Sequence, residues 1–452
     1  MESLVVIIFV LGYLAITLEH NLKIDKLIPA LGMMAVSWAI ISLGHLEVFE
    51  VDAELHSLIP AHMEEVLLHH LGKTAEILIF LIGAMTIVEI IDYFDGFSAI
   101  KGFVRTKSKR RLLWIFSILA FILSAIIDNL TATIVLITIL RKIVLNREDR
   151  IWFVGIIVIA ANSGGAWSPI GDVTTTMLWI AKKVSAFHLV EYLFVPSLVS
   201  VVVPVLIASR FKVFQGKIEE VEEDGSEKVD KYSSIMLYLG LGSILFVPFF
   251  KTITHLPPYV GMMLSLSVVA IFAEIFSNKR ISLTSFDEEH HEDAHYSPVH
   301  KSLAGIEMPS ILFFLGILLA VAALESLGLL FHFAEALDNT VPLLGTEPTT
   351  AGYKVSDLVV LILGVGSAVI DNVPLVAASI GMFSDPMDSH LWHFIAFSAG
   401  TGGSMLIIGS AAGVVAMGME KINFFWYFKK ISWLALIGFL AGAAVFMILR
   451  NF

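Results

Sequence analysis

Residues 124–129 read SAIIDN, and residues 367–372 read SAVIDN, 243 positions further along the chain. In each copy the aspartate is the sole charged residue of an apolar stretch of about 28 residues, whereas one membrane-spanning helix needs about 20. Each arm of about 14 residues reaches only about 20 Å, which is less than the thickness of the hydrocarbon core. We therefore expect two re-entrant hairpins with Asp-Asn at their tips, over residues 112–140 and 358–384. A single kinked helix is the alternative, and Pro374 could kink the second one.

The composition is that of a protein embedded in a membrane. The 452 residues are 57% hydrophobic and 15% charged, whereas a soluble chain carries about 25% charged residues. The absence of cysteine excludes disulfide-stabilised secreted domains and Cys-ligated metal or iron–sulfur centres. The net charge of −12 argues against nucleic-acid binding. We expect an all-α polytopic membrane protein that contacts lipid, is not an enzyme, and uses no cofactor and no nucleic acid.

Ten membrane crossings are expected besides the hairpins. Uninterrupted apolar spans lie over residues 3–20, 26–44, 75–93, 189–209, 234–252, 256–277, 310–330 and 425–448. Two further spans, over residues 151–183 and 389–418, are interrupted by glycines and polar residues. Inside a membrane, non-helical backbone is tolerated only where it is buried in protein or lines a cavity. We therefore expect these two to be crossing helices with an unwound centre. No removable signal peptide is expected at the N-terminus.

The two halves of the chain match each other beyond the hairpins. Residues 164–172 and 402–410 share a Gly-Gly pair and a later Ile-Gly pair at an offset of 238. Each half has five spans, one of them broken, plus one hairpin, and an odd number of crossings inverts the second half. We expect two inverted repeats, residues 1–233 and 234–452, as is typical of secondary transporters. With both termini outside, 23 of the 29 lysines and arginines lie inside, as the positive-inside rule requires.

Carboxylates isolated in apolar segments are the candidate functional groups. A charge at mid-membrane is costly and usually marks an ion or proton path, and a buried carboxylate without a cationic partner favours either a proton or a bound small cation. Na⁺ is a hard cation that takes oxygen ligands. The residues expected to bind the ion or the proton are Asp128, Asn129, Thr131, Asn162, Ser163, Asp172, Asp371, Asn372, Ser398 and Thr401. Na⁺ itself is assigned to the two hairpin tips, Asp128-Asn129 and Asp371-Asn372.

Other polar residues have weaker functional interpretations. For each single serine or threonine, hydrogen bonding to its own helix or close packing is the alternative. Thr174, Thr175 and Thr176 are expected only to cap or pack the half-helix after the break. Glu89 and Glu325 lie 236 positions apart, late in the third span of each half. They are candidates for a proton relay, with a place near the membrane surface as the alternative.

Two acidic, histidine-containing segments are not needed for the transport hypothesis. Residues 45–73 are expected to form an amphipathic helix on the outer membrane surface, with pH sensing by His69 and His70 as the alternative. Residues 285–300 are expected to form a solvated cytoplasmic loop, although their composition would also suit a metal site.

The hairpin tips and the segments 162–172 and 400–410 resemble the NhaD-type sodium/proton antiporters. These belong to the ion-transporter superfamily, together with divalent-anion/sodium symporters, citrate carriers and the arsenite pump. The resemblance covers essentially the whole chain. It implies a homodimer in which a scaffold domain supports a mobile transport domain of hairpins and broken helices. In the anion symporters the tips carry Ser-Asn-Thr, whereas here they carry Asp128-Asn129-Leu130-Thr131 and Asp371-Asn372-Val373-Pro374. The second half also has Ser410 where the first has Asp172, so the two sites need not be equivalent.

Three functions are compatible with membrane-embedded carboxylates. The preferred hypothesis is a Na⁺(Li⁺)/H⁺ antiporter of a bacterial inner membrane that works by alternating access, with protons and cations competing at the aspartates. The alternative within transport is a dicarboxylate/sodium symporter or an arsenite exporter. An intramembrane aspartyl protease is the third possibility, but residues 364–367 read GVGS where such a protease requires Gly-x-Gly-Asp.

Overall fold

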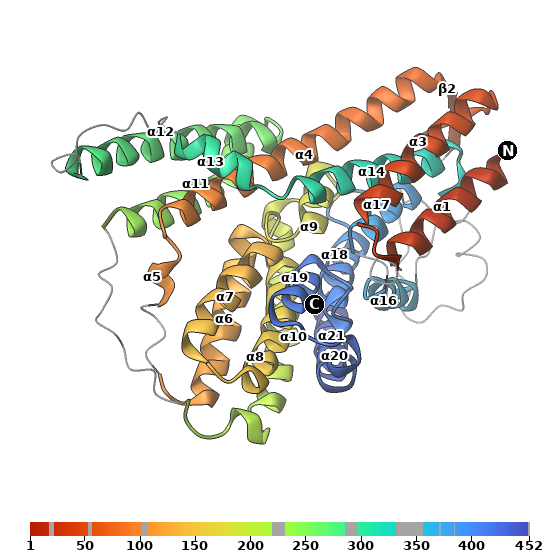
Figure 1. The fold of residues 1–452 in the computed structure, drawn as a ribbon. Helices are drawn as coiled ribbons and strands as arrows, with labels where there is room; N and C mark the ends of the chain where they lie inside the picture. The colour runs from red at the N-terminus through yellow and green to blue at the C-terminus, as the bar shows by residue number, and fades with distance from the viewer. Residues whose placement is uncertain are drawn as a thin grey trace.

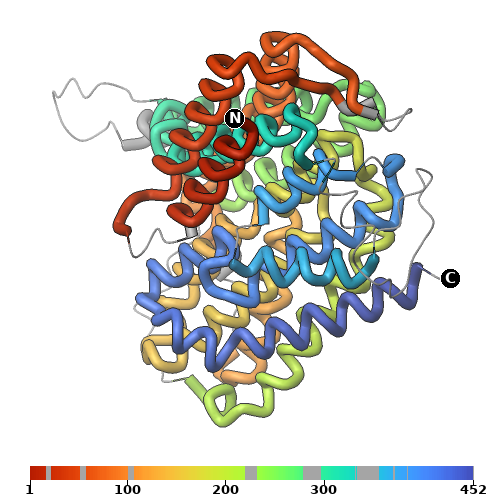
Figure 2. Tube along the Cα trace, turned by 90° about the vertical axis from the view of Figure 1, so that its right-hand side faces the viewer, coloured from red at the N-terminus to blue at the C-terminus, as the bar shows by residue number. Residues whose placement is uncertain are grey.

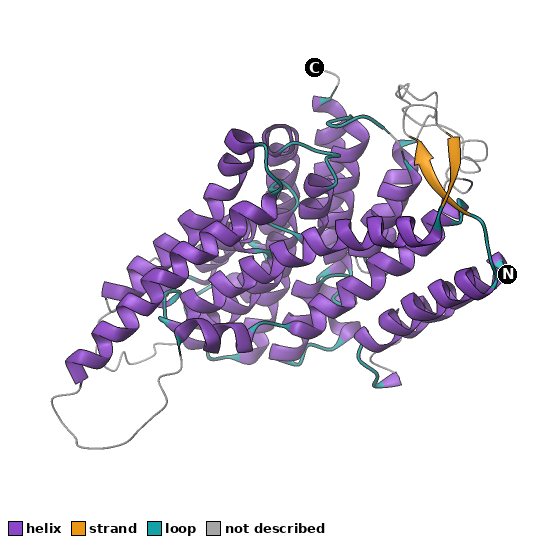
Figure 3. Cartoon of the chain, turned by 90° about the horizontal axis from the view of Figure 1, so that it is seen from above, coloured by secondary structure: helices purple, strands orange, loops and turns teal. Residues whose placement is uncertain are grey.

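A computed structural model describes residues 1–17, 22–52, 57–101, 106–218, 231–284, 297–330, 332, 356–369, 372–383 and 385–450. This part of the chain is helical apart from turns, an isolated bridge and one antiparallel strand pair, β1 (Val48–Asp52) and β2 (Ser57–Ala61). The helices form two groups that pack on each other (Figure 1). Figure 3 shows the strand pair at the edge of the helical bundle.

The first group surrounds the long helix α4, and we call it the α4 group. It contains α1 (Glu2–Thr17), α3 (Leu27–Leu43), α4 (Met63–Tyr93), α11 (Lys231–Thr254), α12 (Pro258–Thr284), α13 (Pro298–Gly305) and α14 (Met308–Ser326). Helix α3 packs against α1 and α14, while α4 contacts α11 to α14. The α3–α14 contact is close, because a Cβ at Gly316 would lie 2.8 Å from the carbonyl carbon of Ala30. Trp38 also donates a hydrogen bond of 2.9 Å to the carbonyl of Leu319.

The second group holds both hairpins and both broken helices, and we call it the hairpin group. Its helices are α6 (Lys109–Ile127), α7 (Asn129–Ile143), α8 (Arg147–Gly165), α9 (Val173–Ile180), α10 (Ala186–Ala208), α16 (Asp357–Gly366), α17 (Asn372–Met382), α18 (His390–Gly402), α19 (Ala411–Glu420), α20 (Phe424–Lys430) and α21 (Ser432–Leu449). The short elements α5 (Ser98–Lys101), η1 (Lys212–Phe214) and η2 (Gly403–Met405) complete the described fold. Figure 2 shows the red N-terminal helices at one end of the molecule and the blue C-terminal helices towards the other.

The all-α polytopic membrane fold is confirmed. Within the described residues, seven helices are long and apolar enough to cross a membrane: α4, α6, α10, α11, α12, α14 and α21. The repeat boundaries, residues 1–233 and 234–452, stay a prediction. Helices α10 and α21, the fifth span of each half, pack along each other and join the hairpin group rather than the α4 group.

Each of the two predicted hairpin ranges contains two helices, and their re-entry from one side of the membrane stays a prediction. Helices α6 and α7 meet at Asp128, whose φ of 81° breaks the helix, and they pack against each other. The second pair consists of α16 and α17, and its predicted tip residue Asp371 lies outside the described residues. Helices α16 and α17 lie on either side of that position, and the hairpin over residues 358–384 stays a prediction.

Each of the ranges 151–183 and 389–418 contains a helix, a break and a second helix, and their crossing of the membrane stays a prediction. The break separates α8 from α9 in the first half, and α18 from η2 and α19 in the second. Each broken helix passes a hairpin arm at a glycine. A Cβ at Gly164 would lie 2.3 Å from the carbonyl oxygen of Phe121, and one at Gly402 would lie 2.1 Å from that of Gly364. Only glycine permits these backbone contacts, which explains the first glycine of the Gly-Gly pair in each half.

Two predictions about helices are wrong. Residues 45–73 do not form one amphipathic surface helix, because they contain the strand pair and the first turns of α4. Val48 and Val66 are buried there, so contacts with the rest of the protein, not the membrane surface, organise this segment. The predicted span 425–448 is divided into α20 and α21, of which α21 is long and apolar enough to cross a membrane, so the span begins at Ser432 rather than at residue 425. The predicted loop 285–300 falls mostly outside the described residues, and α13 begins at Pro298.

Candidate functional site

Asp128 is the N-cap of α7 at the tip of the first hairpin. Its Oδ1 accepts a hydrogen bond of 2.8 Å from the backbone N–H of Thr131, and its Oδ2 accepts one of 2.9 Å from the Thr131 hydroxyl. A carboxylate at this position satisfies an unpaired N–H group and lies at the positive end of the helix dipole. The predicted site residue Thr131 therefore holds the Asp128 carboxylate in place.

Asn129, the next residue, reaches both broken helices through Asn162. The Asn129 amide donates to Oδ1 of Asn162 at 3.4 Å, and the amide of Asn162 donates to the Ser410 hydroxyl at 3.0 Å. All three side chains are buried. Ser410 precedes α19 and accepts a hydrogen bond from the backbone N–H of Gly413 as its N-cap. We call Asn129, Asn162 and Ser410 the neutral half-site.

A second cluster forms around the buried carboxylate of Asp172. Its Oδ2 accepts hydrogen bonds of 2.9 Å from the amide of Asn372 and of 2.9 Å from the hydroxyl of Thr174. A Cβ at Gly400 would lie 3.7 Å from the same oxygen, so the break of α18 also approaches it. Asp172 is 3% exposed and precedes α9. We call Asp172, Asn372 and Thr174 the acidic half-site.

The two half-sites are counterparts in the two halves of the chain. Asn129 corresponds to Asn372 at the hairpin offset of 243, and Asp172 corresponds to Ser410 at the broken-helix offset of 238. A further matching pair of hydrogen bonds surrounds them: Ser124 donates to the carbonyl of Ala161, and Ser367 donates to that of Ala399. The exchange of aspartate for serine makes one half-site acidic and leaves the other neutral.

Several predicted site residues lie in these clusters and others do not. Thr401 donates a hydrogen bond of 2.6 Å to the carbonyl of Phe397 in its own helix. This is the alternative to ion binding that the sequence left open for each serine and threonine. Ser163 and Ser398 are buried beside the breaks, and the Ser398 hydroxyl makes no hydrogen bond within the described residues. The assignment of Na⁺ to Asp371 concerns a residue outside the described part of the chain. The ion-binding roles of all these residues stay predictions.

Glu89 and Glu325 lie outside both half-sites. Glu89 approaches α13, since a Cβ at Gly305 would lie 2.9 Å from its Oε2. Glu325 belongs to α14 and approaches α17, since a Cβ at Gly381 would lie 2.9 Å from its Oε2. Glu325 therefore lies where the α4 group meets the hairpin group, whereas Glu89 lies within the α4 group. Their positions differ, and the relay stays a prediction.

Near Glu325, Lys183 occupies the turn after α9. Its ammonium donates to the carbonyl of Phe383 at 3.4 Å and lies 4.5 Å from the ring of Trp392. The carboxylates of Glu325 and Asp385 lie close enough to interact electrostatically with this ammonium. The lysine thus supplies a positive charge at the far end of α9 from Asp172.

Sequence reasoning missed two members of the half-sites. The offset of 238 aligns Ser410 with Asp172, but Ser410 is not among the residues predicted to bind the ion. Thr174 was expected only to cap or pack α9, but its hydroxyl binds the Asp172 carboxylate itself. No local signal distinguishes Thr174 from Thr175, whose hydroxyl bonds to the backbone carbonyl of Asp172.

The arrangement favours cations over anions. A helix N-terminus attracts negative charge, and here the chain's own carboxylates occupy the N-terminal ends of α7 and α9. An anionic substrate approaching these ends would meet Asp128 or Asp172, whereas a small cation would find carboxylate, amide and hydroxyl oxygens together.

Comparisons with known proteins give the family. The citrate transporter (CitMHS) family profile matches residues 4–390. Sodium/proton antiporter 1 of Arabidopsis thaliana is 41% identical over 98% of this chain and 72% of its own length. The Na(+)/H(+) antiporter NhaD of Alkalimonas amylolytica is 31% identical over 97% and 88% of the two chains. The crystal structure of the Alcanivorax borkumensis YdaH transporter shares the fold with a TM-score of 0.56 at 13% identity, over 94% of this chain and 96% of that chain. The chain belongs to the citrate transporter (CitMHS) family, and its relatives include the NhaD-type sodium/proton antiporters.

Proposed function

We propose that this protein exchanges Na⁺, or Li⁺, for H⁺ across a membrane. The observation that carries the proposal is the buried contact between Asp172 and Asn372, which brings a carboxylate of one broken helix to the tip of the opposite hairpin. The names of the relatives, sodium/proton antiporters in plants and bacteria, support the same exchange.

The physical basis is competition for carboxylate oxygens. A buried carboxylate that is ionised and empty is costly, so it is stable when it holds either a proton or a cation. We propose that Asp128, Asp172 and Asp371 alternate between these two states. The hairpin group would move relative to the α4 group with one or the other bound, so that each site faces the two sides in turn.

Topology and assembly belong to the same proposal. The lysine and arginine distribution supports both termini outside, with the connection between α7 and α8 in the cytoplasm. The bacterial NhaD relatives support placement in a bacterial inner membrane. We propose a homodimer, as the family resemblance implies.

The test is Na⁺-driven proton movement in inside-out membrane vesicles that contain the protein. We expect wild-type protein to release the imposed pH gradient on addition of Na⁺ or Li⁺, and Asp128→Asn and Asp371→Asn to lose at least about tenfold in rate. Asp149→Asn, an aspartate paired with Lys109 away from the half-sites, is the matched control and should remain active. Wild-type activity in both variants would overturn the site. Uptake of citrate without Na⁺/H⁺ exchange would overturn the function.

A further inference from the structure

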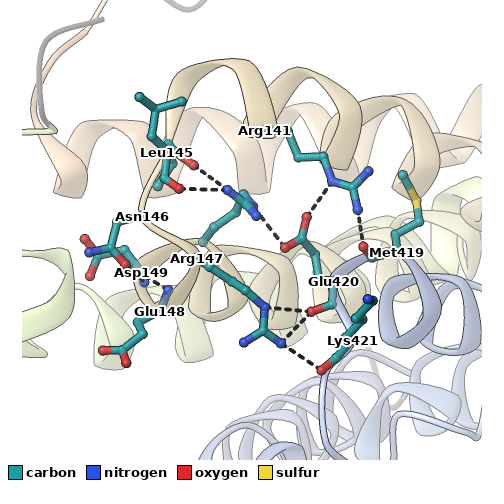
Figure 4. Close-up of polar contacts among 11 residues, drawn as sticks. Arg141, Leu145, Asn146, Arg147, Glu148, Asp149, Met419, Glu420 and Lys421 are labelled. Atoms are coloured by element: carbon teal, nitrogen blue, oxygen red, sulfur yellow. Dashed lines mark hydrogen bonds and ion pairs between the residues drawn. The ribbon is translucent and has the colours of Figure 1, made fainter.

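The C-terminal end of α19 is held by arginines from the first half of the chain. Glu420 is the last residue of α19, and its side chain is 1% exposed. Its Oε1 accepts a hydrogen bond of 2.7 Å from Nε of Arg141, and its Oε2 accepts one of 2.9 Å from Nε of Arg150. Figure 4 shows Arg141 and Arg147 directed at this helix end. Two guanidinium groups thus enclose one buried carboxylate.

The arginines also bind the terminal carbonyl groups of α19. Arg147 donates from Nη2 to the carbonyl oxygens of Glu420 and Lys421, at 2.8 Å each, and Arg141 donates to that of Met419 (Figure 4). These carbonyls have no partner within the helix and form the negative end of its dipole. The cluster of Arg141, Arg147, Arg150 and Glu420, which we call the arginine clamp, therefore holds both the side chain and the backbone.

The other end of α19 is the neutral half-site. Ser410 precedes the helix and accepts the 3.0 Å hydrogen bond from Asn162. Asn162 lies near the C-terminal end of α8 and Arg150 near its N-terminal end, so α8 binds α19 at both ends. The ten residues from Ser410 to Glu420 span about 15 Å at 1.5 Å per residue. The position of Ser410 along this axis is therefore tied to the position of Glu420.

The first half has a different contact beyond its second half-helix. Lys183 follows α9 and donates to the carbonyl of Phe383 just after α17. This contact is not a repeat copy of the arginine clamp, because the offset of 238 aligns Glu420 with Lys182.

We propose that Glu420 is a positioning residue for ion binding: through the arginine clamp it sets the axial position of α19 and so keeps Ser410 in hydrogen-bond contact with Asn162. A shift of about 0.5 Å would already stretch a 3.0 Å hydrogen bond to the edge of its useful range. A buried ion pair contributes little net stability because of its desolvation cost, and setting the register of packed helices is its best-attested role. This inference rests on the proposed Na⁺/H⁺ exchange.

The first experiment measures the half-saturating Na⁺ concentration of Glu420→Gln in inside-out vesicles. We expect a rise of about fivefold, which corresponds to one lost hydrogen bond, with the rate at saturating Na⁺ within about twofold of wild type. Arg147→Ala removes the hydrogen bonds to the carbonyls of Glu420 and Lys421 and leaves both arginine partners of the Glu420 carboxylate in place, so it tests the same point if Glu420→Gln folds poorly. Asp149→Asn breaks the 2.5 Å ion pair with Lys109 at the same end of α8, does not touch α19, and should leave the half-saturating concentration unchanged.

The second experiment asks whether Glu420 acts through Ser410. In a Ser410→Ala background, Glu420→Gln should raise the half-saturating concentration by less than about twofold, because the contact that it positions is already absent. Independent, multiplying effects of the two substitutions would overturn the positioning role. So would wild-type half-saturation in both Glu420→Gln and Arg147→Ala, provided that the wild type exchanges Na⁺ for H⁺. Absence of exchange in the wild type would instead overturn the proposed function, and the positioning role with it.

Discussion

Asn372 and Asp172 lie 200 positions apart, and the Asn372 amide donates a hydrogen bond of 2.9 Å to Oδ2 of Asp172. Both side chains are buried. The bond joins the second hairpin to the break of the first broken helix, so it connects the two halves of the chain. Hydrogen bonds to charged groups contribute about 1.5–3 kcal/mol, which is enough to decide whether a carboxylate is held in one orientation.

Asn372→Ala tests the value of this bond for ion binding. The substitution leaves the Asp172 carboxylate with one donor fewer, so we expect the half-saturating Na⁺ concentration to rise by about 10- to 100-fold. Its counterpart Asn129 donates instead to the neutral Asn162, at 3.4 Å, and Asn129→Ala should cost less than about tenfold. Transport assays in vesicles measure both. Equal effects of the two substitutions would contradict the larger contribution expected from the hydrogen bond to the Asp172 carboxylate.

Asp172→Ser gives the first broken helix the residue that the second has at the corresponding place. Asp172 precedes α9 without a capping hydrogen bond from its side chain, and a serine there can cap the helix as Ser410 caps α19, so helix stability should change by no more than about 1 kcal/mol. The anionic ligand is lost, however, and we expect Na⁺-driven proton movement to fall to the background of empty vesicles. Thermal unfolding in detergent checks that the variant is folded. Substantial exchange by a folded Asp172→Ser protein would show that Asp172 is dispensable.

The breaks and hairpins were predictable because their signals are local. Gly164 and Gly402 sit where a broken helix passes a hairpin arm, and Asp128 caps the helix that begins at the hairpin tip. Segments of unusual length and paired glycines report such features without knowledge of the rest of the fold. The splitting of the last span at Lys430 and the strand pair before α4 depend on packing partners far along the chain, and hydropathy alone does not reveal them.

The contacts that assemble the half-sites could not be predicted in this way. Asn162 reaches Ser410 across 248 positions, and Asn372 reaches Asp172 across 200. The repeat offsets show which residues correspond, but not which residues touch, because contact depends on how the two halves cross. The arginine clamp illustrates the same limit, since Arg141 and Arg150 read in sequence as ordinary basic residues at the ends of membrane segments.

Competition between protons and Na⁺ predicts a definite pH dependence. As the pH falls, protons occupy the carboxylates, so the half-saturating Na⁺ concentration should rise, by up to about tenfold per pH unit for one competing proton. Saturating Na⁺ should restore the maximal rate, because the two ligands exclude each other rather than act at separate sites. Vesicle assays over a series of pH values measure this. A half-saturating concentration that is independent of pH, with only the maximal rate changing, would contradict a shared site.

Gly402→Ala tests the close contact between a broken helix and a hairpin. The new Cβ would lie 2.1 Å from the carbonyl oxygen of Gly364 and 2.6 Å from the Ser367 hydroxyl. Relief of such a clash needs movement of the backbone, so we expect destabilisation of about 1–3 kcal/mol and a lower Tm in detergent. Gly242, inside α11, has no atom within 4 Å of an added Cβ, and Gly242→Ala should leave the Tm unchanged or raise it, because alanine favours a helix over glycine by about 0.5–1 kcal/mol. Equal Tm values for the two variants would show that α16 and α18 can move apart at little cost. That result would contradict close packing of the two helices at Gly402.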